Sequence, residues 1–414
     1  MSESKQVVIV GAGIVGVSTA IWLRRAGCDV TLIDRGAPGQ GTSFGNGGVL
    51  AACAMVPVTT PGLALKGPKL VFDPDFPLFM RWSYLPKLAP WLLRYLSKAN
   101  DEDTRRIAEG LTTIVADSVE QHQSLVDSTP AARFMNTSTY SFAYTDRAAF
   151  AADSYVWELR RLAGFEPEVV EGAAVQEVEP AFGPAIGLLA VMQNHGYIAD
   201  PGNYVATLAS TFEEMGGKLV RAEVTDFELS GGDINAVLTD QGRFECDKAV
   251  LCTGVWSKPL ASKLGLKVPL ESERGYHILF KNPTISPRAP VMVASGKFVA
   301  TPMEMGLRCA GIVEFGGLEA GPSKAPVKLL KRQVKETFPD LEYSDTEEWL
   351  GHRPAPADSL PLIGEIGSSG VYCAFGHHHI GLTGGPKTGR LIAGLISGER
   401  PNEDLSAYDP NRFH

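Results

Sequence analysis

The chain opens with a run of apolar residues that gives way to a glycine-rich segment. Residues 7–10 are all valine or isoleucine, as expected for a strand buried on both faces of a parallel sheet. The next segment has helical apolar spacing and ends at Gly27, and "DVTLID" at 29–34 forms a second apolar run. This order predicts a strand–helix–strand unit at the start of the chain.

The spacing of apolar residues changes several times along the rest of the chain. Residues 85–130 have the 3.6-residue apolar period of helices, and 200–220 predict a helix opened by Asp200 and Pro201. Short alternating runs follow, with a hairpin signal at 231–233, and 268–318 are again strand-like. The last 75 or so residues return to strand and helix character, with "GVYCAF" as a strand and a helix from Pro386.

At 414 residues the chain exceeds what one hydrophobic core usually supports. We therefore predict an α/β plus β protein. Its discontinuous Rossmann-type domain spans 1–84, 145–265 and 325–414. A β-rich substrate domain spans 85–144 and 266–324 and carries a helical insertion.

The first turn carries a dinucleotide fingerprint. Gly11, Gly13 and Gly16 follow the strand directly as G-x-G-x-x-G, and Asp34 ends the second strand. The glycines allow a tight turn and close approach to a pyrophosphate, and the carboxylate takes ribose hydroxyls. Asp34 disfavours a 2′-phosphate, although Arg35 next to it leaves NADP open. We expect the ligand to contact this turn also through Ile14 and Val15.

Two further segments favour FAD over NAD. The loop "GTSFGNGG" at 41–48 is rich in small residues and backbone donors and suits a flavin edge; a flexible connection is the alternative. Its candidate ligand residues are Thr42, Ser43, Asn46, Gly47 and Gly48. The predicted strand at 249–252 ends in Thr253 and Gly254, a small-residue turn that resembles those near the nucleotide in FAD-dependent oxidoreductases.

Three consecutive histidines at 377–379 raise the question of a metal. His377 and His379 would alternate to point the same way, but no Cys or carboxylate nearby completes a ligand set. The flanking glycines indicate instead that backbone approaches a flat ligand. We predict no metal here.

The overall composition limits the kinds of partner that we expect the chain to bind. A net charge of −9 argues against nucleic acid as a ligand. The six scattered cysteines indicate reduced thiols in a cytoplasmic protein, and no leader or membrane-spanning run is evident. The stretch at 84–98 mixes large apolar and basic residues. It leaves peripheral contact with the inner membrane open, beside the reading of a buried helix.

Taken together, the fingerprint, "TSFGNGG", "GHRPAPADSLPLIG" (351–364) and "GHHHIGLTGGPKTGR" (376–390) resemble the D-amino-acid oxidase superfamily of FAD-dependent oxidoreductases. The branch most similar in these motifs is that of bacterial D-amino-acid and D-hydroxyproline dehydrogenases. The resemblance implies that Arg353 pairs with the substrate carboxylate, a match of planar groups. It also implies a loop that turns under the flavin through Gly376, His377, Gly381, Leu382 and Thr383. The family's flavin-linking cysteine has no counterpart at 351–364, so noncovalent FAD is expected.

Fewer signals identify the other residues beside the substrate. His379 either borders the substrate or is packed and silent. In "ERGYHILF" (273–280), Tyr276 and His277 alternate on a strand, so one of them faces the site, and we favour Tyr276. Arg274 is either a second carboxylate partner or a surface charge.

The expected reaction is FAD-dependent oxidation of a D-amino acid or cyclic imino acid, such as a D-proline or hydroxyproline. Hydride would pass from Cα to flavin N5, and electrons would pass on to a quinone or another carrier. No general base is required if the amine arrives neutral. The alternatives are a glycine- or sarcosine-type oxidase using oxygen, an NAD-dependent dehydrogenase, and a non-catalytic FAD-binding protein. A homo-oligomer is left open.

Overall fold

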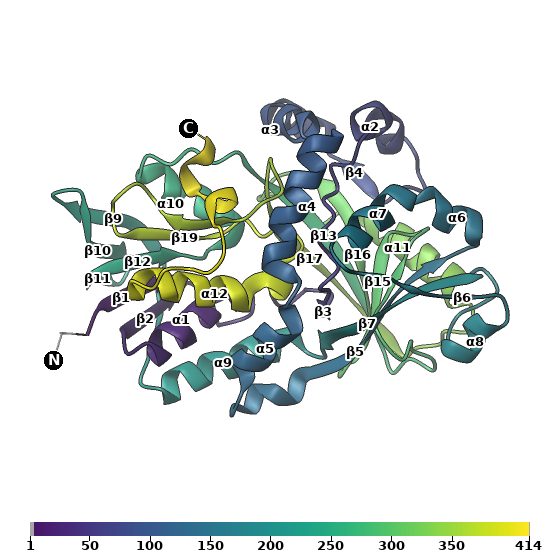
Figure 1. The fold of residues 1–414 in the computed structure, drawn as a ribbon, viewed down its shortest axis with the longest axis horizontal. Coiled ribbons are helices and arrows are strands. Elements are labelled where there is room, and N and C mark those ends of the chain that lie inside the picture. Colours follow the sequence, from purple (N-terminus) through teal and green to yellow (C-terminus); the bar gives the residue numbers. More distant parts are fainter. Residues whose placement is uncertain (1–3, 414) are drawn as a thin grey trace.

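Two large sheets lie side by side in the molecule (Figure 1). The structure is a computed structural model that describes residues 4–413, apart from the side chains of residues 66 and 68. Helix α4 runs between the two halves in the view of Figure 1, and both termini lie on the side of the parallel sheet. The two sheets therefore meet at a junction near the middle of the molecule.

The first sheet confirms the predicted strand–helix–strand unit. Its six strands, in spatial order, are β18 (Leu362–Glu365), β19 (Val371–Phe375), β12 (Lys248–Leu251), β1 (Gln6–Val10), β2 (Asp29–Asp34) and β8 (Lys218–Arg221). All neighbours are parallel except β18, which runs antiparallel to β19. The carboxyl ends of β1, β2 and β12 therefore share one edge, where open α/β sheets bind their ligands.

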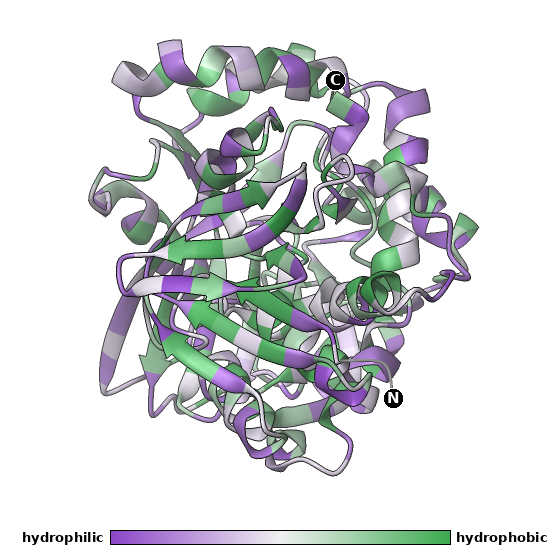
Figure 2. Cartoon of the chain, turned by 90° about the vertical axis from the view of Figure 1, so that its left-hand side faces the viewer, coloured by the Kyte–Doolittle hydropathy of each residue, from purple (hydrophilic) through white to green (hydrophobic). Residues whose placement is uncertain are grey.

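Helices and a small sheet complete this half. The helices are α1 (Ile14–Arg25), α5 (Ser118–Val126), α9 (Pro201–Glu214), α10 (Ser257–Lys263) and α12 (Gly381–Ser397). A three-stranded antiparallel sheet contains β9 (Val224–Ser230), β10 (Asp233–Thr239) and β11 (Gly242–Glu245), with the predicted hairpin between β9 and β10. Strands seen from this side carry apolar residues over much of their length (Figure 2).

The second sheet is larger and mixed. Its path is β17 (Asp345–Pro356), β13 (Leu270–Lys281), β16 (Gly306–Phe315), β15 (Phe298–Met303), β14 (Val291–Val293), β5 (Met135–Tyr144), β7 (Leu188–Ile198) and β3 (Val49–Leu50). Strand β4 (Leu78–Met80) adds to β16, and β6 (Glu168–Glu171) adds to β7. The range 145–265 thus contributes to both sheets, and the predicted domain boundaries stay a prediction.

The remaining helices surround this sheet and the junction. They are α2 (Leu63–Val71), α3 (Leu85–Ser97), α4 (Asp101–Val115), α6 (Arg147–Ala152), α7 (Ser154–Leu162), α8 (Ala174–Val178) and α11 (Lys324–Thr337). Short 3-10 turns occupy Trp82–Tyr84, Pro130–Phe134, Gly254–Trp256, Ser406–Tyr408 and Pro410–Phe413. Across the described residues, none of the helices has both the length and the apolar character of a membrane span.

The predicted start of the last helix was wrong. Helix α12 begins at Gly381, and Pro386 lies inside it. A proline has no N–H, so the carbonyl four residues earlier loses its helical partner. That carbonyl, of Leu382, instead accepts a hydrogen bond from Nε2 of His122 at 2.8 Å. Burial lowers the pKa of His122 to about 4, and its neutral ring accepts at Nδ1 from the hydroxyl of Tyr204.

Candidate active site

A single cavity of about 1630 Å³ runs from the edge of the parallel sheet to the face of the large sheet. Most predicted site residues line it: Gly11, Gly13, Ile14, Val15, Asp34, Arg35, Thr42, Ser43, Asn46, Gly47, Thr253, Gly254, Tyr276, Arg353, Gly376, His377, His379, Gly381, Leu382 and Thr383. Gly16, Gly48, Arg274 and His277 lie outside its lining. The cavity exceeds the size typical of one drug-sized ligand, which leaves room for a dinucleotide and a substrate.

The nucleotide end of the cavity fits FAD. Gly11 has φ +106°, and a side chain there would lie 2.7 Å from the carbonyl oxygen of Cys252. A side chain at Gly16 would lie 1.8 Å from the carbonyl oxygen of Gly11, so this glycine lets helix α1 pack against the turn. The turn therefore brings bare backbone and the N-terminus of α1 to the cavity, as a pyrophosphate requires.

The carboxylate of Asp34 organises the same turn. Its two oxygens accept hydrogen bonds from the backbone N–H groups of Ala12 and Gly36, each at 2.7 Å. The side chain also lines the cavity, where a ribose hydroxyl would meet it. Arg35 stacks on Trp256, with its guanidinium carbon 4.8 Å from the ring centre.

The loop at 41–48 is anchored by its carbonyl groups. Arg308 donates to the carbonyls of Phe44 and Asn46 at 2.9 and 2.8 Å, His277 donates to Gly45 at 3.0 Å, and the Thr301 hydroxyl donates to Gly47 at 2.6 Å. Four consecutive carbonyls are thus held by the large sheet, while Gly45, Asn46 and Gly47 line the cavity. The loop is a fixed wall of the cavity and not a flexible connection.

Sequence analysis did not predict that Arg308 and His277 anchor this loop. Arg308 is 2% exposed, and burial lowers its pKa to about 10, with Asp200 opposing the shift. His277 stacks on Trp349 at 5.2 Å. Burial and then Arg308 lower the pKa of His277 to about 3, so the ring is neutral and Nδ1 carries the proton that Gly45 accepts.

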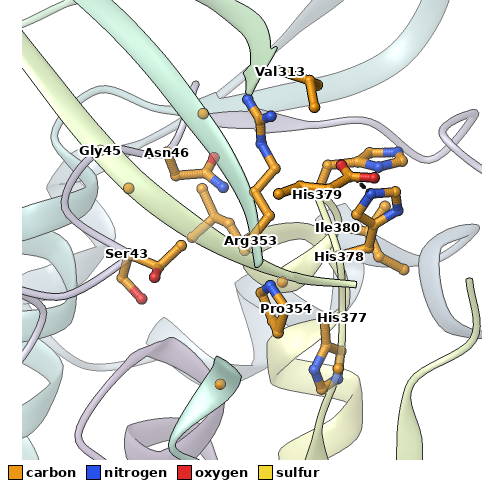
Figure 3. Close-up of a pocket in the computed structure, with 18 of the residues that line it drawn as sticks. Ser43, Gly45, Asn46, Val313, Arg353, Pro354, His377, His378, His379 and Ile380 are labelled. Atoms are coloured by element: carbon orange, nitrogen blue, oxygen red, sulfur yellow. Dashed lines mark hydrogen bonds and ion pairs between the residues drawn. The ribbon is translucent and has the colours of Figure 1, made fainter. Parts of the chain in front are cut away.

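At the other end of the cavity, Arg353 projects from β17 across β13 (Figure 3). The two strands pair with Glu273 opposite Arg353 and Gly275 opposite Gly351. A side chain at Gly275 would lie 2.5 Å from Cζ and Nη2 of Arg353, so the guanidinium occupies the space that this glycine leaves. The glycine is therefore part of how the arginine is positioned.

A bulge in β16 faces the same guanidinium. The register shifts between Gly275 and Tyr276, and Ile312 has φ +56°, a strained conformation for a β-branched residue. The carbonyls of Ile312 and Gly311 lie 3.4 Å from Nη1 and Nη2 of Arg353. These are long hydrogen bonds, and within residues 4–413 no carboxylate lies within 4.0 Å of the guanidinium. The guanidinium thus retains donors for a ligand anion.

Beside Arg353 lies a pair that sequence reasoning missed. Nε2 of His378 is 2.5 Å from Oε2 of Glu273, and both residues line the cavity. Burial opposes ionisation of Glu273, but His378 and Arg353 outweigh it and hold the pKa of the carboxyl below its usual value. The sequence did contain one signal for Glu273: side chains alternate along a strand, which places Glu273 and Gly275 on the same face.

The three histidines do not form one group. His378 has φ +50°, which breaks the expected alternation, and Figure 3 shows His377 pointing away from His378 and His379. His377 donates from Nε2 to the hydroxyl of Thr388 at 2.9 Å. His379 presents its ring to the cavity, so it is accessible there although protein surrounds it; burial and then His378 lower its pKa. Among residues 4–413, no set of three metal-ligating side chains comes together.

Tyr276 and Arg274 belong to a neighbouring cluster. Arg274 is completely buried, with Nε 3.0 Å from Oε2 of Glu314. The Tyr276 hydroxyl donates to the same carboxylate oxygen at 2.6 Å and accepts from the backbone N–H of Ser323. The ring of Tyr276 lines the cavity while its hydroxyl is already occupied.

Comparison with known proteins shows which family has these features. The model described as "DAO: FAD dependent oxidoreductase" matches residues 6–395. A D-amino-acid oxidase of Bradyrhizobium diazoefficiens is 39% identical over the full length of both chains, and a D-amino acid dehydrogenase of Rhizobium rhizogenes is 29% identical over 99% of this chain and 100% of that protein.

Solved structures show the same fold. An L-proline dehydrogenase from P. horikoshii superimposes with a TM-score of 0.74 at 21% identity, covering 100% of this chain and 98% of the other. A glycine oxidase from Bacillus cereus gives 0.71 at 18% identity, covering 96% of each chain. The family match and the cavity agree. This chain belongs to the DAO family of FAD dependent oxidoreductases.

Proposed function

We propose that the protein oxidises the Cα–N bond of a D-amino acid or a cyclic imino acid with noncovalent FAD. The observation that carries this proposal is the guanidinium of Arg353, which lies in the cavity with its donors only weakly used. A planar guanidinium is suited to a planar carboxylate. The names of the two relatives above, a D-amino-acid oxidase and a D-amino acid dehydrogenase, support the substrate class.

In this proposal the chain works chiefly by orientation. Arg353 holds the substrate carboxylate and so fixes which hydrogen of Cα is presented to the cofactor. When bound, FAD would accept the hydride. The cavity walls include Val313, which lies near Arg353 in Figure 3, and Phe315, so they offer apolar surface to an apolar or cyclic side chain.

Noncovalent binding is supported by the position of the thiols. All six cysteines are buried, and Cys252 is the one that lines the cavity in the described part of the chain. It lies against Gly11, at the nucleotide end. Burial raises the pKa of its thiol, which keeps it protonated and unreactive.

For the electron acceptor, we propose a quinone or another carrier, reached at the surface of α2 and α3. Leu65, Phe72, Trp82 and Leu93 are exposed there. Residues 56–98 contain six lysines and arginines against two aspartates, in a chain of net charge −9. A basic, apolar surface is suited to an anionic bilayer. Oxygen is the second candidate, favoured by the name of the relative that is 39% identical.

An anaerobic panel of D- and L-amino acids, scored by bleaching of the flavin, tests the substrate class. Steady-state rates with a dye and then with air alone on the active substrate test the acceptor. We expect bleaching by D-amino acids or D-proline-like compounds, and dye rates well above the rate of peroxide release. A clear L-preference, or no bleaching by any amino acid, would refute the substrate class.

A further inference from the structure

Glu273 and His378 form a buried acid–base pair that the orientation of the carboxylate does not require. The side chains of Glu273 and His378 are 7% and 4% exposed, yet both residues line the cavity. They come from different halves of the molecule: Glu273 from β13 of the large sheet, and His378 from the loop after β19 of the parallel sheet. Buried titratable groups with specific partners in a cavity are typical of functional sites.

The geometry determines where the proton shared by the two side chains lies. Glu273 is ionised, so Nε2 of His378 carries the hydrogen that the carboxylate accepts at 2.5 Å. The backbone N–H of His378 donates to the carbonyl of Pro354 at 2.9 Å, which fixes the residue next to Arg353. Nδ1 of His378 has no hydrogen-bond partner among residues 4–413. Of the two ring nitrogens, Nε2 is thus engaged by a carboxylate, and Nδ1 is the one left to exchange a proton with a ligand.

We propose that this pair removes the proton from the α-ammonium group of the bound substrate. The inference rests on the proposed function. Glu273 pairs with Arg353 across the two strands, and His378 is bonded to the residue after Arg353, so a substrate whose carboxylate is held by Arg353 would have its α-nitrogen near the pair. One N–H bond of the ammonium breaks, its electron pair stays on nitrogen, and the proton forms a bond with Nδ1 of His378. The resulting imidazolium is paired with the Glu273 carboxylate, and the neutral amine has the lone pair that assists loss of hydride from Cα.

The surroundings favour His378 as the acceptor over its neighbours. The other titratable groups near Glu273 are Arg353 on β17, His379 in the same loop, and Tyr95 on α3. Arg353 cannot accept a proton. His379 has no carboxylate within 4.0 Å among the described residues, so its imidazolium would be unsupported. Tyr95 is protonated, because burial and then Glu273 raise its pKa.

The test compares Glu273→Gln with Glu271→Gln. Glu271 is a buried carboxyl on the same strand, bonded to Tyr84 and outside the cavity lining. We expect wild type and Glu271→Gln to share one dependence of kcat/KM on pH. For Glu273→Gln, kcat/KM should fall by about 10² or more at neutral pH, because a positioned acid–base group contributes about that factor. It should then rise about tenfold per pH unit toward the wild-type value as the free substrate amine deprotonates.

A second measurement does not depend on turnover. 2-Aminoisobutyrate has the ammonium and carboxylate groups but no hydrogen on Cα, so it binds without being oxidised. At neutral pH, Glu273→Gln should bind it about tenfold or more weakly, and Glu271→Gln should bind it as wild type does. FAD content and thermal melting of each variant report whether it has folded.

The outcomes separate the two proposals. Turnover of D-amino acids by wild type, with a Glu273→Gln loss that is constant across pH, would overturn the role of the pair and leave the proposed function standing. Unchanged kcat/KM at neutral pH in a folded Glu273→Gln variant would do the same. If no amino acid reduces the wild-type enzyme, both fail together.

Discussion

Replacing Gly275 with alanine should displace the guanidinium of Arg353 while leaving Arg353 itself unchanged. The added methyl would lie 2.5 Å from Cζ and Nη2 and 2.9 Å from Nη1, whereas ordinary contacts begin near 3.4 Å. The guanidinium must therefore move by about 1 Å, a misplacement that costs on the order of 10²-fold in rate for an orienting group. We expect kcat/KM to fall about 100-fold, or about 2.7 kcal/mol of transition-state stabilisation.

The fold should survive this change. The clash is with the end of a flexible side chain, and Gly275 does not have a positive φ that would strain alanine. Gly321→Ala is the matched control, because a side chain at Gly321 has no heavy atom within 4 Å. Steady-state kinetics, FAD content and thermal melting are measured on both. A Gly275→Ala enzyme with kcat/KM within threefold of wild type would refute the positioning role, and a parallel loss of FAD would show that the damage is general.

Three further outcomes follow from the same structure. Arg353→Ala should retain FAD and lose about 2–5 kcal/mol of transition-state stabilisation, which is a thirtyfold to several-thousandfold loss in kcat/KM. Arg353→Lys should recover only part of this loss because lysine lacks the planar fork. Near-normal kcat/KM in the alanine variant would remove Arg353 from the site. Denaturation should release FAD into the supernatant, and flavin that precipitates with the chain would contradict noncovalent binding. As the pH is lowered, the melting temperature should begin to fall near pH 6.5 rather than near pH 4. Burial lowers the pKa of both His122 and His377 to about 4 in the folded protein, whereas these histidines take up protons below about pH 6.5 in the unfolded chain. Stability is therefore lost as the pH falls from about 6.5 to about 4. His122→Asn should flatten part of this slope, and an unchanged slope would show that His122 is not the group responsible.

The nucleotide half was predictable from sequence because its signals are local. Residues 6–34 give strand, glycine turn, helix and terminal acid in one continuous segment, and each part needs only its neighbours to form. The start of α12 was missed because the decisive contact is distant. Leu382 has its carbonyl bonded by His122, which is 260 residues away in the chain.

The end of the cavity around Arg353 was less predictable, because its geometry also depends on distant contacts. Arg353 was identified by resemblance, but its placement depends on an absent side chain at Gly275 and on a bulge at Ile312 in a third strand. Neither feature has a sequence signature of its own. Arg308 illustrates the limit: an arginine in an apolar strand suggests a ligand partner, yet it binds the carbonyls of Phe44 and Asn46 and so holds the loop at 41–48.

The contacts at this end connect the two halves of the molecule. Arg308 and His277 extend from the large sheet to the loop that follows β2, and Glu273 extends from it to the loop that follows β19. Each contact buries a charged or polar group, which is costly unless the partner is correctly placed. The relative position of the loop at 41–48 and strand β13 is therefore set by polar contacts that tolerate little displacement. A misplacement of about 1 Å at a positioned group costs on the order of 10²-fold in rate, so these contacts would preserve the alignment that the proposed reaction requires.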